Sequence, residues 1–184
     1  MPVDASTVNL ALLRGINVGG KNKLPMKDLA AIFAGAGCAD VRTFIQSGNV
    51  IFRATPAVLK NLGPKVSAAI EKQFGLRIPI VLLSRQELAA GVKSNPFAVK
   101  GADEKALHLY FLGNAASKEN IASLDAGRSP GDSFHVKGRS IYLHLPQGMA
   151  RTKLTNAYFD KQLGTVSTAR NWATTLKLLA MMQE

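Results

Sequence analysis

The residues best suited to bind a ligand gather between an apolar run that ends at Leu13 and a helical pattern that begins at Pro25. This stretch holds three glycines, two asparagines and three cations, Arg14, Lys21 and Lys23. A connection between two elements needs only a few residues, with one Gly or Asn at a special backbone angle. Glycine N–H groups beside Lys and Arg are typical of an anion site. We predict that this loop binds an anion; a mobile, solvated loop is the alternative.

The spacing of Gly15, Gly20 and Lys21 nearly matches a P-loop. In that motif backbone N–H groups and a lysine hold phosphates, while a Ser or Thr hydroxyl binds magnesium. Asn22 stands where the hydroxyl belongs, and Pro25 places the start of the helix several residues too late. These departures argue against a nucleotide-hydrolysing P-loop and favour a looser cradle of backbone amides.

The predicted site includes four further positions outside that loop. A turn at Ser47-Gly48 brings polar neighbours to a strand, although the sequence does not fix which end of the strand they occupy. Polar residues near the C-terminus complete the site if the last helix returns to the first sheet. The predicted ligand-binding residues are Arg14, Asn17, Gly19, Gly20, Lys21, Asn22, Lys23, Gln46, Asn49, Arg170 and Asn171.

The chain offers no clear catalytic constellation. No Ser-His-acid order, HExxH motif or carboxylate pair is present, and Asp103-Glu104 lie in a polar stretch. Cys38, the single cysteine, excludes an internal disulfide and a cysteine metal cluster. We predict no metal site and no cofactor, and the sequence leaves open whether the protein is an enzyme.

Hydrophobic spacing predicts the elements that position these residues. Residues 1–84 follow the order strand, helix, strand, strand, helix, strand, which is the ferredoxin-like order. A break or kink is expected at Gly63-Pro64. The predicted strands are 8–13, 41–46, 49–53 and 76–82, and the predicted helices are 25–35 and 58–74.

Residues 85–184 repeat this pattern loosely. Ser167 or Thr168 is expected to cap a helix over 167–182, where the last strand of a second ferredoxin-like unit belongs. The other predicted elements are helices 85–92, 117–126 and 154–163 and strands 106–112, 133–137 and 140–145. The predicted fold class is therefore α+β, with two ferredoxin-like (α–β plait) units and mainly antiparallel sheets. The second unit is incomplete in this prediction, and the C-terminal helix packs back on the first.

Strand patterning differs between the halves. In the first half both strand faces are apolar, so a second layer must cover the sheet, and the predicted cover is the last helix through Trp172, Leu176, Leu179 and Ala180. In the second half, alternation places three histidines and two tyrosines on one open face. Such a face fits a stacking platform for single-stranded RNA or a domain or dimer interface, and a metal site is a weak third reading. Its residues are His108, Tyr110, His135, Tyr142 and His144.

The charge of the chain favours a polyanionic partner. Twenty-three Lys and Arg against 12 Asp and Glu give a net charge of +11, and the excess is spread over both halves. A basic folded body favours nucleic acid or nucleotides. The first ten residues lack a signal-peptide pattern, and no apolar run is long enough to span a bilayer. We expect a cytoplasmic protein with no membrane partner; its oligomeric state stays open.

Four motifs in order resemble one family. Residues 11–20 (ALLRGINVGG) and 44–52 (FIQSGNVIF), followed by 153–156 (KLTN) and 168–172 (TARNW), resemble the bacterial family termed domain of unknown function 1697. The resemblance implies two ferredoxin-like units, and it implies no established activity, cofactor or catalytic residue. Ala173 stands where the family pattern has Asn.

Our hypothesis from the sequence is a protein that binds an anionic ligand through its Gly-rich basic loop, with nucleic acid or a nucleotide as the leading class. One alternative is a small-molecule enzyme that acts on a phosphorylated substrate in a groove between the halves. The other alternative is a protein-interaction scaffold.

Overall fold

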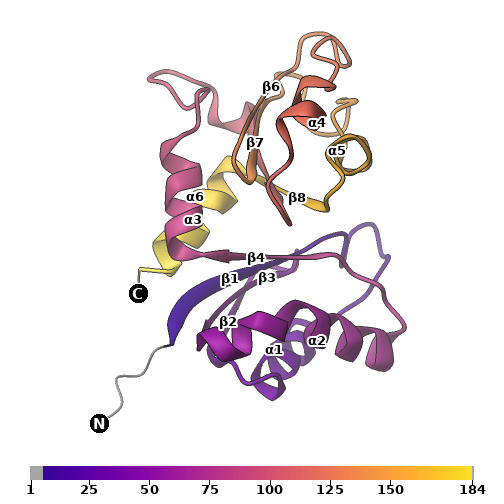
Figure 1. Ribbon diagram of the computed structural model, residues 1–184, viewed down its shortest axis with the longest axis vertical. Helices are drawn as coiled ribbons and strands as arrows, with labels where there is room; N and C mark the ends of the chain where they lie inside the picture. The colour runs from indigo at the N-terminus through magenta and orange to yellow at the C-terminus, as the bar shows by residue number, and fades with distance from the viewer. Residues whose placement is uncertain (1–5, 184) are drawn as a thin grey trace. The chain divides into compact units, whose positions relative to one another are not determined.

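The structure, a computed structural model, describes residues 6–183 of the 184-residue chain. The signal-peptide prediction rests partly on residues 1–5, which lie outside the described residues. The described chain forms two compact units, residues 6–88 with 178–183 (unit 1) and residues 89–177 (unit 2). Figure 1 shows the elements of each.

Unit 1 has the predicted ferredoxin-like order. Its four-stranded antiparallel sheet has the strand order β2-β3-β1-β4, and two helices cover one of its faces (Figure 1). The elements are β1 (Thr7–Leu13), α1 (Met26–Gly35), β2 (Ala39–Phe44), β3 (Asn49–Ala54), α2 (Pro56–Phe74) and β4 (Ile80–Ser84).

Of the expected break or kink at Gly63-Pro64, the break is wrong, because α2 continues through Pro64 for its full 19 residues; the kink stays a prediction. Leu62, Val66 and Ile70 are completely buried on its inner face. Their packing outweighs the one backbone hydrogen bond that Pro64 removes.

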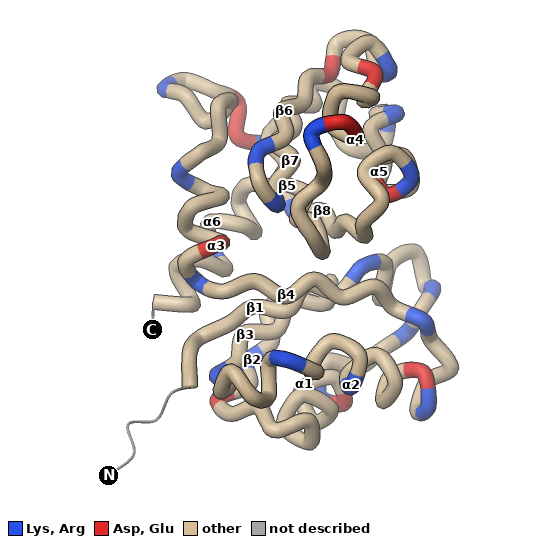
Figure 2. Tube along the Cα trace, in the orientation of Figure 1, with Lys and Arg blue, Asp and Glu red and all other residues tan. Residues whose placement is uncertain are grey.

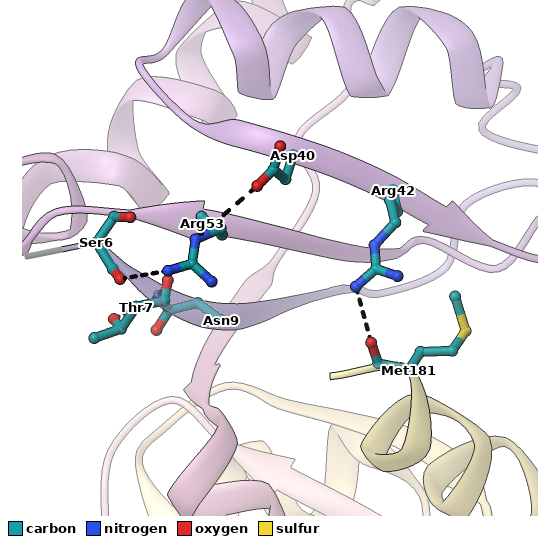
Figure 3. Close-up of polar contacts among 7 residues, drawn as sticks. All are labelled: Ser6, Thr7, Asn9, Asp40, Arg42, Arg53 and Met181. Carbon is teal, nitrogen blue, oxygen red and sulfur yellow. Dashed lines mark hydrogen bonds and ion pairs between the residues drawn. The ribbon is translucent and has the colours of Figure 1, made fainter. Parts of the chain in front are cut away.

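Both faces of the unit 1 sheet are buried, as the strand pattern predicted. Ala11 and Leu13 of β1 belong to the core under α1 and α2, whereas Leu10 and Leu12, on the opposite face, are also fully buried. Unit 1 also contains the end of the last helix, α6 (Trp172–Met181). There the Nη2 atom of Arg42 donates to the carbonyl oxygen of Met181 at 2.8 Å (Figure 3). An arginine suits this position because a helix C-terminus carries unsatisfied carbonyl groups.

The predicted stripe on this helix is only partly right. Trp172 is buried, but Ala180 is exposed and Leu176 and Leu179 are half-buried. The buried residues are Trp172, Thr175, Leu178 and Met182. Thr175 is tolerated on the buried side because its hydroxyl donates to the carbonyl oxygen of Asn171 at 2.9 Å.

Unit 2 is a complete ferredoxin-like unit, which corrects the prediction of an incomplete one. Residues 167–171 form a strand, β8, that pairs with β5, and α6 begins only at Trp172. The side-chain oxygen of Asn171 accepts from the N–H of Thr174 at 2.8 Å and so caps α6. The strand order is β6-β7-β5-β8. The elements are α3 (Arg85–Lys93), which begins in unit 1, η1 (Glu104–Ala106), β5 (Leu107–Leu112), α4 (Lys118–Ala122), β6 (Ser133–Lys137), β7 (Ser140–His144), α5 (Asn156–Leu163) and β8 (Ser167–Asn171).

The three histidines do not share one sheet face. Tyr110 pairs with Ile141, and His108 pairs with Leu143. Directly paired residues of antiparallel strands lie on the same face, so Tyr110 and His108 lie on the apolar face that includes Ile141. Tyr110 is indeed part of the core around Phe159, and its hydroxyl donates to the carbonyl oxygen of Leu154 at 3.0 Å.

Of the five predicted platform residues, His135, Tyr142 and His144 therefore share one sheet face. The rings of His135 and Tyr142 lie 6.3 Å apart and nearly parallel, and Tyr142 itself is buried. His144 stacks on Phe97 at 6.0 Å. The rings of this face contact other rings of unit 2. We therefore do not assign this face as an open platform for nucleic acid.

Candidate anion-binding loop

The loop between β1 and α1, residues 14–24, has a defined fold. Gly19 and Gly20 have φ angles of 58° and 76°, the left-handed backbone of a tight hairpin turn. The N–H of Lys21 donates to the carbonyl oxygen of Val18 at 3.0 Å, and the N–H of Asn17 donates to that of Asn22 at 3.1 Å. The loop is thus a small hairpin closed by backbone hydrogen bonds.

The side chain of Asn17 ties this hairpin to the rest of unit 1. Its Nδ2 atom donates to the carbonyl oxygens of Leu24 and Gln46, each at 2.9 Å. Its Oδ1 atom accepts from the N–H of Leu24 at 2.9 Å. Asn22 closes the other side, because its Nδ2 atom donates to the carbonyl oxygen of Gly15 at 2.8 Å. The two asparagines predicted as ligand contacts therefore also hold the loop in shape.

Two further segments lie at the same end of the unit 1 sheet. The N–H of Leu13 donates to the carbonyl oxygen of Gly48 at 2.8 Å, and that of Arg14 donates to the carbonyl oxygen of Pro79 at 3.1 Å. The turn 45–48 and the segment 75–79 therefore flank the loop. Gln46 therefore lies at the same end of the unit 1 sheet as the 14–24 loop. Sequence reasoning missed Pro79, because no motif marks its segment.

Asn49 lies inside the turn. It is fully buried, and its Nδ2 atom donates to the carbonyl oxygen of Phe44 and to the hydroxyl of Ser47, each at 3.0 Å. Its amide nitrogen stabilises the turn that carries Gln46. It faces the interior, so it is a poor candidate for a ligand contact.

The charge of the loop is entirely positive. Lys21 and Lys23 are exposed, Arg14 is half-buried, and residues 14–24 contain no acid. Figure 2 marks basic positions on the segment between β1 and α1. Among the residues that the structure describes, none accepts a hydrogen bond from the N–H of Gly19 or Gly20. Backbone amides and cations of this kind suit a phosphate, sulfate or carboxylate group.

The loop does not work as a P-loop does. α1 begins at Met26, and its N-cap residue, Pro25, makes no side-chain capping bond. A phosphate beside Lys21 would therefore meet the hairpin turn, with the first turn of α1 several residues further along the chain. The looser amide cradle stays a prediction from the sequence.

Arg170 and Asn171 lie in β8 of unit 2, where their side chains have local partners. Arg170 is 8% exposed, and its Nη1 atom donates to the carbonyl oxygen of Ala169 at 2.7 Å and to the hydroxyl of Thr168 at 3.0 Å. Burial lowers the pKa of Arg170 to about 10, so it stays charged near pH 7. Asn171 is the N-terminal cap of α6, whereas the predicted helix over 167–182 would place it within the first turn.

Unit 1 also has a hollow of about 350 Å³ beside β2 and β3, lined in part by Arg42 and Arg53. Its arginines already have protein partners (Figure 3). Arg53 lies 4.0 Å from Asp40 and donates to the carbonyl oxygen of Ser6 at 3.1 Å, while Arg42 donates to Met181. We therefore keep the 14–24 loop as the candidate site.

Other reactive groups are buried or scattered. Burial raises the pKa of the Cys38 thiol to about 11, against the smaller opposing effect of Lys65. Such a thiol is a poor nucleophile at neutral pH. Within residues 6–183, no three His, Cys, Asp or Glu side chains are placed to share a metal ion. No helix of this range is long and apolar enough to cross a bilayer.

Comparisons with known proteins agree with this fold. The chain matches the model of the family described as "Protein of unknown function (DUF1697)" over residues 7–142, which confirms the resemblance; the motifs at 153–156 and 168–172 lie beyond the matched span. It is also similar to the solved structure of conserved bacterial protein SP0830 from Streptococcus pneumoniae. The TM-score is 0.71 with 23% identity, over 97% of this chain and 99% of that chain. At this identity the likeness shows the fold alone. No curated protein sequence matches the chain.

Proposed function

The chain belongs to the family described as "Protein of unknown function (DUF1697)", and we propose that its 14–24 loop binds an anionic ligand, with nucleic acid or a nucleotide as the leading class. One observation carries this proposal: a hairpin held by Asn17 and Asn22 presents Lys21, Lys23 and two glycine amides without any acid beside them in the loop. A held loop does not have to be ordered when the ligand binds, so less entropy is lost. The proposal places the protein in the cytoplasm, where nucleotides and RNA occur.

A salt titration tests the proposal. Binding of a short labelled oligouridylate would be followed by fluorescence anisotropy at increasing salt. For single strands the slope of log K against log salt is about 0.7 per contacted phosphate. Replacing Lys21 and Lys23 together by Ala should lower that slope by about one to two and weaken binding at low salt.

A matched control is needed because the net charge of +11 attracts any polyanion. Lys60→Ala with Lys72→Ala removes two exposed lysines from α2 of the same unit. The proposal requires this control to bind more tightly than the variant lacking Lys21 and Lys23. If both double variants lower the affinity and the salt slope by the same amount, the loop is not a specific binding site and binding depends only on the overall charge.

A further inference from the structure

The residue at position 45 has a backbone that its side chain disfavours. Ile45 has a φ of 49°, in the left-handed region. Gly, Asn and Asp tolerate this region, whereas a β-branched side chain collides with its own backbone there. Nearby positions with positive φ hold the tolerant types, Asn17, Asn22 and Gly48 among them. Ile45 is the exception.

Packing does not account for this residue. Ile45 is 49% exposed, so about half of the residue remains in contact with solvent. Its backbone is fixed by its neighbours, because the carbonyl oxygen of Gln46 accepts from Asn17 and that of Gly48 accepts from Leu13. The turn would keep its shape with Gly or Asn at position 45. A strained residue that is not needed for the fold suggests a functional role.

The position of Ile45 suggests which role. It precedes Gln46, whose carbonyl group is bonded to Asn17, and Val18 follows Asn17 in the loop. Val18 is 62% exposed. Two exposed aliphatic residues are thus the chain neighbours of the two residues joined by the bond between the turn and the basic hairpin. An inorganic anion or a sugar phosphate has no apolar surface for them, but a nucleotide unit has both a phosphate and a flat, apolar base.

We infer that Ile45, with Val18, packs against a base of a bound single-stranded nucleic acid whose phosphates lie at the basic hairpin. This inference rests on the proposed function and makes it more specific. Base contact of this kind tolerates different sequences, because every base has an apolar face. Ile45 is then a contact residue that distinguishes a nucleotide chain from other polyanions.

The test compares two polyanions, oligouridylate and inorganic polyphosphate, which has no bases. Ile45→Gly and Ile45→Asn should each weaken oligouridylate binding about 5-fold, the low end of the range for one base stacked on an aromatic side chain, because an aliphatic side chain covers less of the base. Neither variant should change polyphosphate binding. Both should unfold at the same or higher urea concentration than the wild type, because they relieve the left-handed strain. Val99→Gly, which removes another exposed aliphatic side chain, should leave both affinities unchanged.

The inference is overturned if the Ile45 variants bind oligouridylate as the wild type does, or lose both polyanions equally. Its failure can be told apart from failure of the proposed function. If the Lys21 and Lys23 double variant alone loses oligouridylate, the basic site stands and the base contact is wrong. If that variant binds as well as the Lys60 and Lys72 control, both fail. Uridine monophosphate, tested in parallel, shows whether one nucleotide unit suffices.

Discussion

Asn17→Ala is the most direct test of the loop as a built structure. The substitution removes three hydrogen bonds that reach two segments, residue 24 on one side and Gln46 on the other. Leu24 is fully buried, so water cannot easily replace the lost partner of its backbone. Asn17 also has a φ of 53°, which Ala adopts less readily than Asn.

The expected loss in the free energy of unfolding is the sum of the lost hydrogen bonds and the backbone strain. Each hydrogen bond contributes about 1 kcal/mol net, and a left-handed Ala costs about 1 kcal/mol more. We therefore expect Asn17→Ala to lower the free energy of unfolding of unit 1 by about 4 kcal/mol. Asn17→Gly, which has no strain at this φ, should lose about 3 kcal/mol.

Two measurements check this prediction. Urea unfolding followed by far-UV circular dichroism gives the stability, and hydrogen exchange at the amide of Leu24 reports the loop itself. Asn61→Ala is the control, because Asn61 is exposed on α2 and Ala suits a helix. The assignment of Asn17 as the residue that holds the loop would be refuted if Asn17→Ala lowers the free energy of unfolding to within 1 kcal/mol of the control and the amide of Leu24 still exchanges slowly.

Three further predictions concern single sites. Gly48→Ala should lower the free energy of unfolding by about 3 kcal/mol in urea, because a Cβ there would lie 2.7 Å from the Cβ of Leu13. Gly138 has open space around it, so Gly138→Ala should lower the free energy of unfolding by only about 1 kcal/mol. Equal losses for the two variants would contradict the clash at Gly48. Cys38, with its pKa raised to about 11, should resist a thiol reagent at pH 8 until the protein is unfolded; fast native labelling would show that it is accessible. Burial lowers the pKa of His108, so the neutral form favours folding: stability should be complete above about pH 6.5 and fall as the pH drops below it. His108→Gln should flatten that decline, and an unchanged pH profile would assign it to other groups.

The sequence predicted most of the fold because most elements have strong periodicity. It missed β8, since five residues, STARN, are too short to show alternation and their Ser and Thr resemble a helix cap. It assigned His108 and Tyr110 to the wrong face of the sheet, because which residues of two paired strands share a face depends on the register of the pair. That register shows Tyr110 opposite Ile141, and a pairing shifted by one residue exchanges the two faces.

The candidate site was predictable in part. Cations and glycines in a long connection are visible in the sequence, and Lys21 and Lys23 are exposed in the structure as an anion site requires. The roles of Asn17 and Asn49 were not visible, because their partners are backbone carbonyls that only folding brings near. The backbone angle of Ile45 is likewise set by contacts of the turn with the loop.

The bond between Arg42 and Met181 has a consequence for how the protein is made. Unit 1 contains residues from both ends of the chain, since 178–183 join 6–88. A ribosome delivers the first strand early and the closing segment last, with all of unit 2 in between. Unit 1 therefore gains residues 178–183 only after the whole of unit 2 has been synthesised. A chain truncated after residue 177 and released from the ribosome should consequently show a protected unit 2 and a more protease-sensitive unit 1.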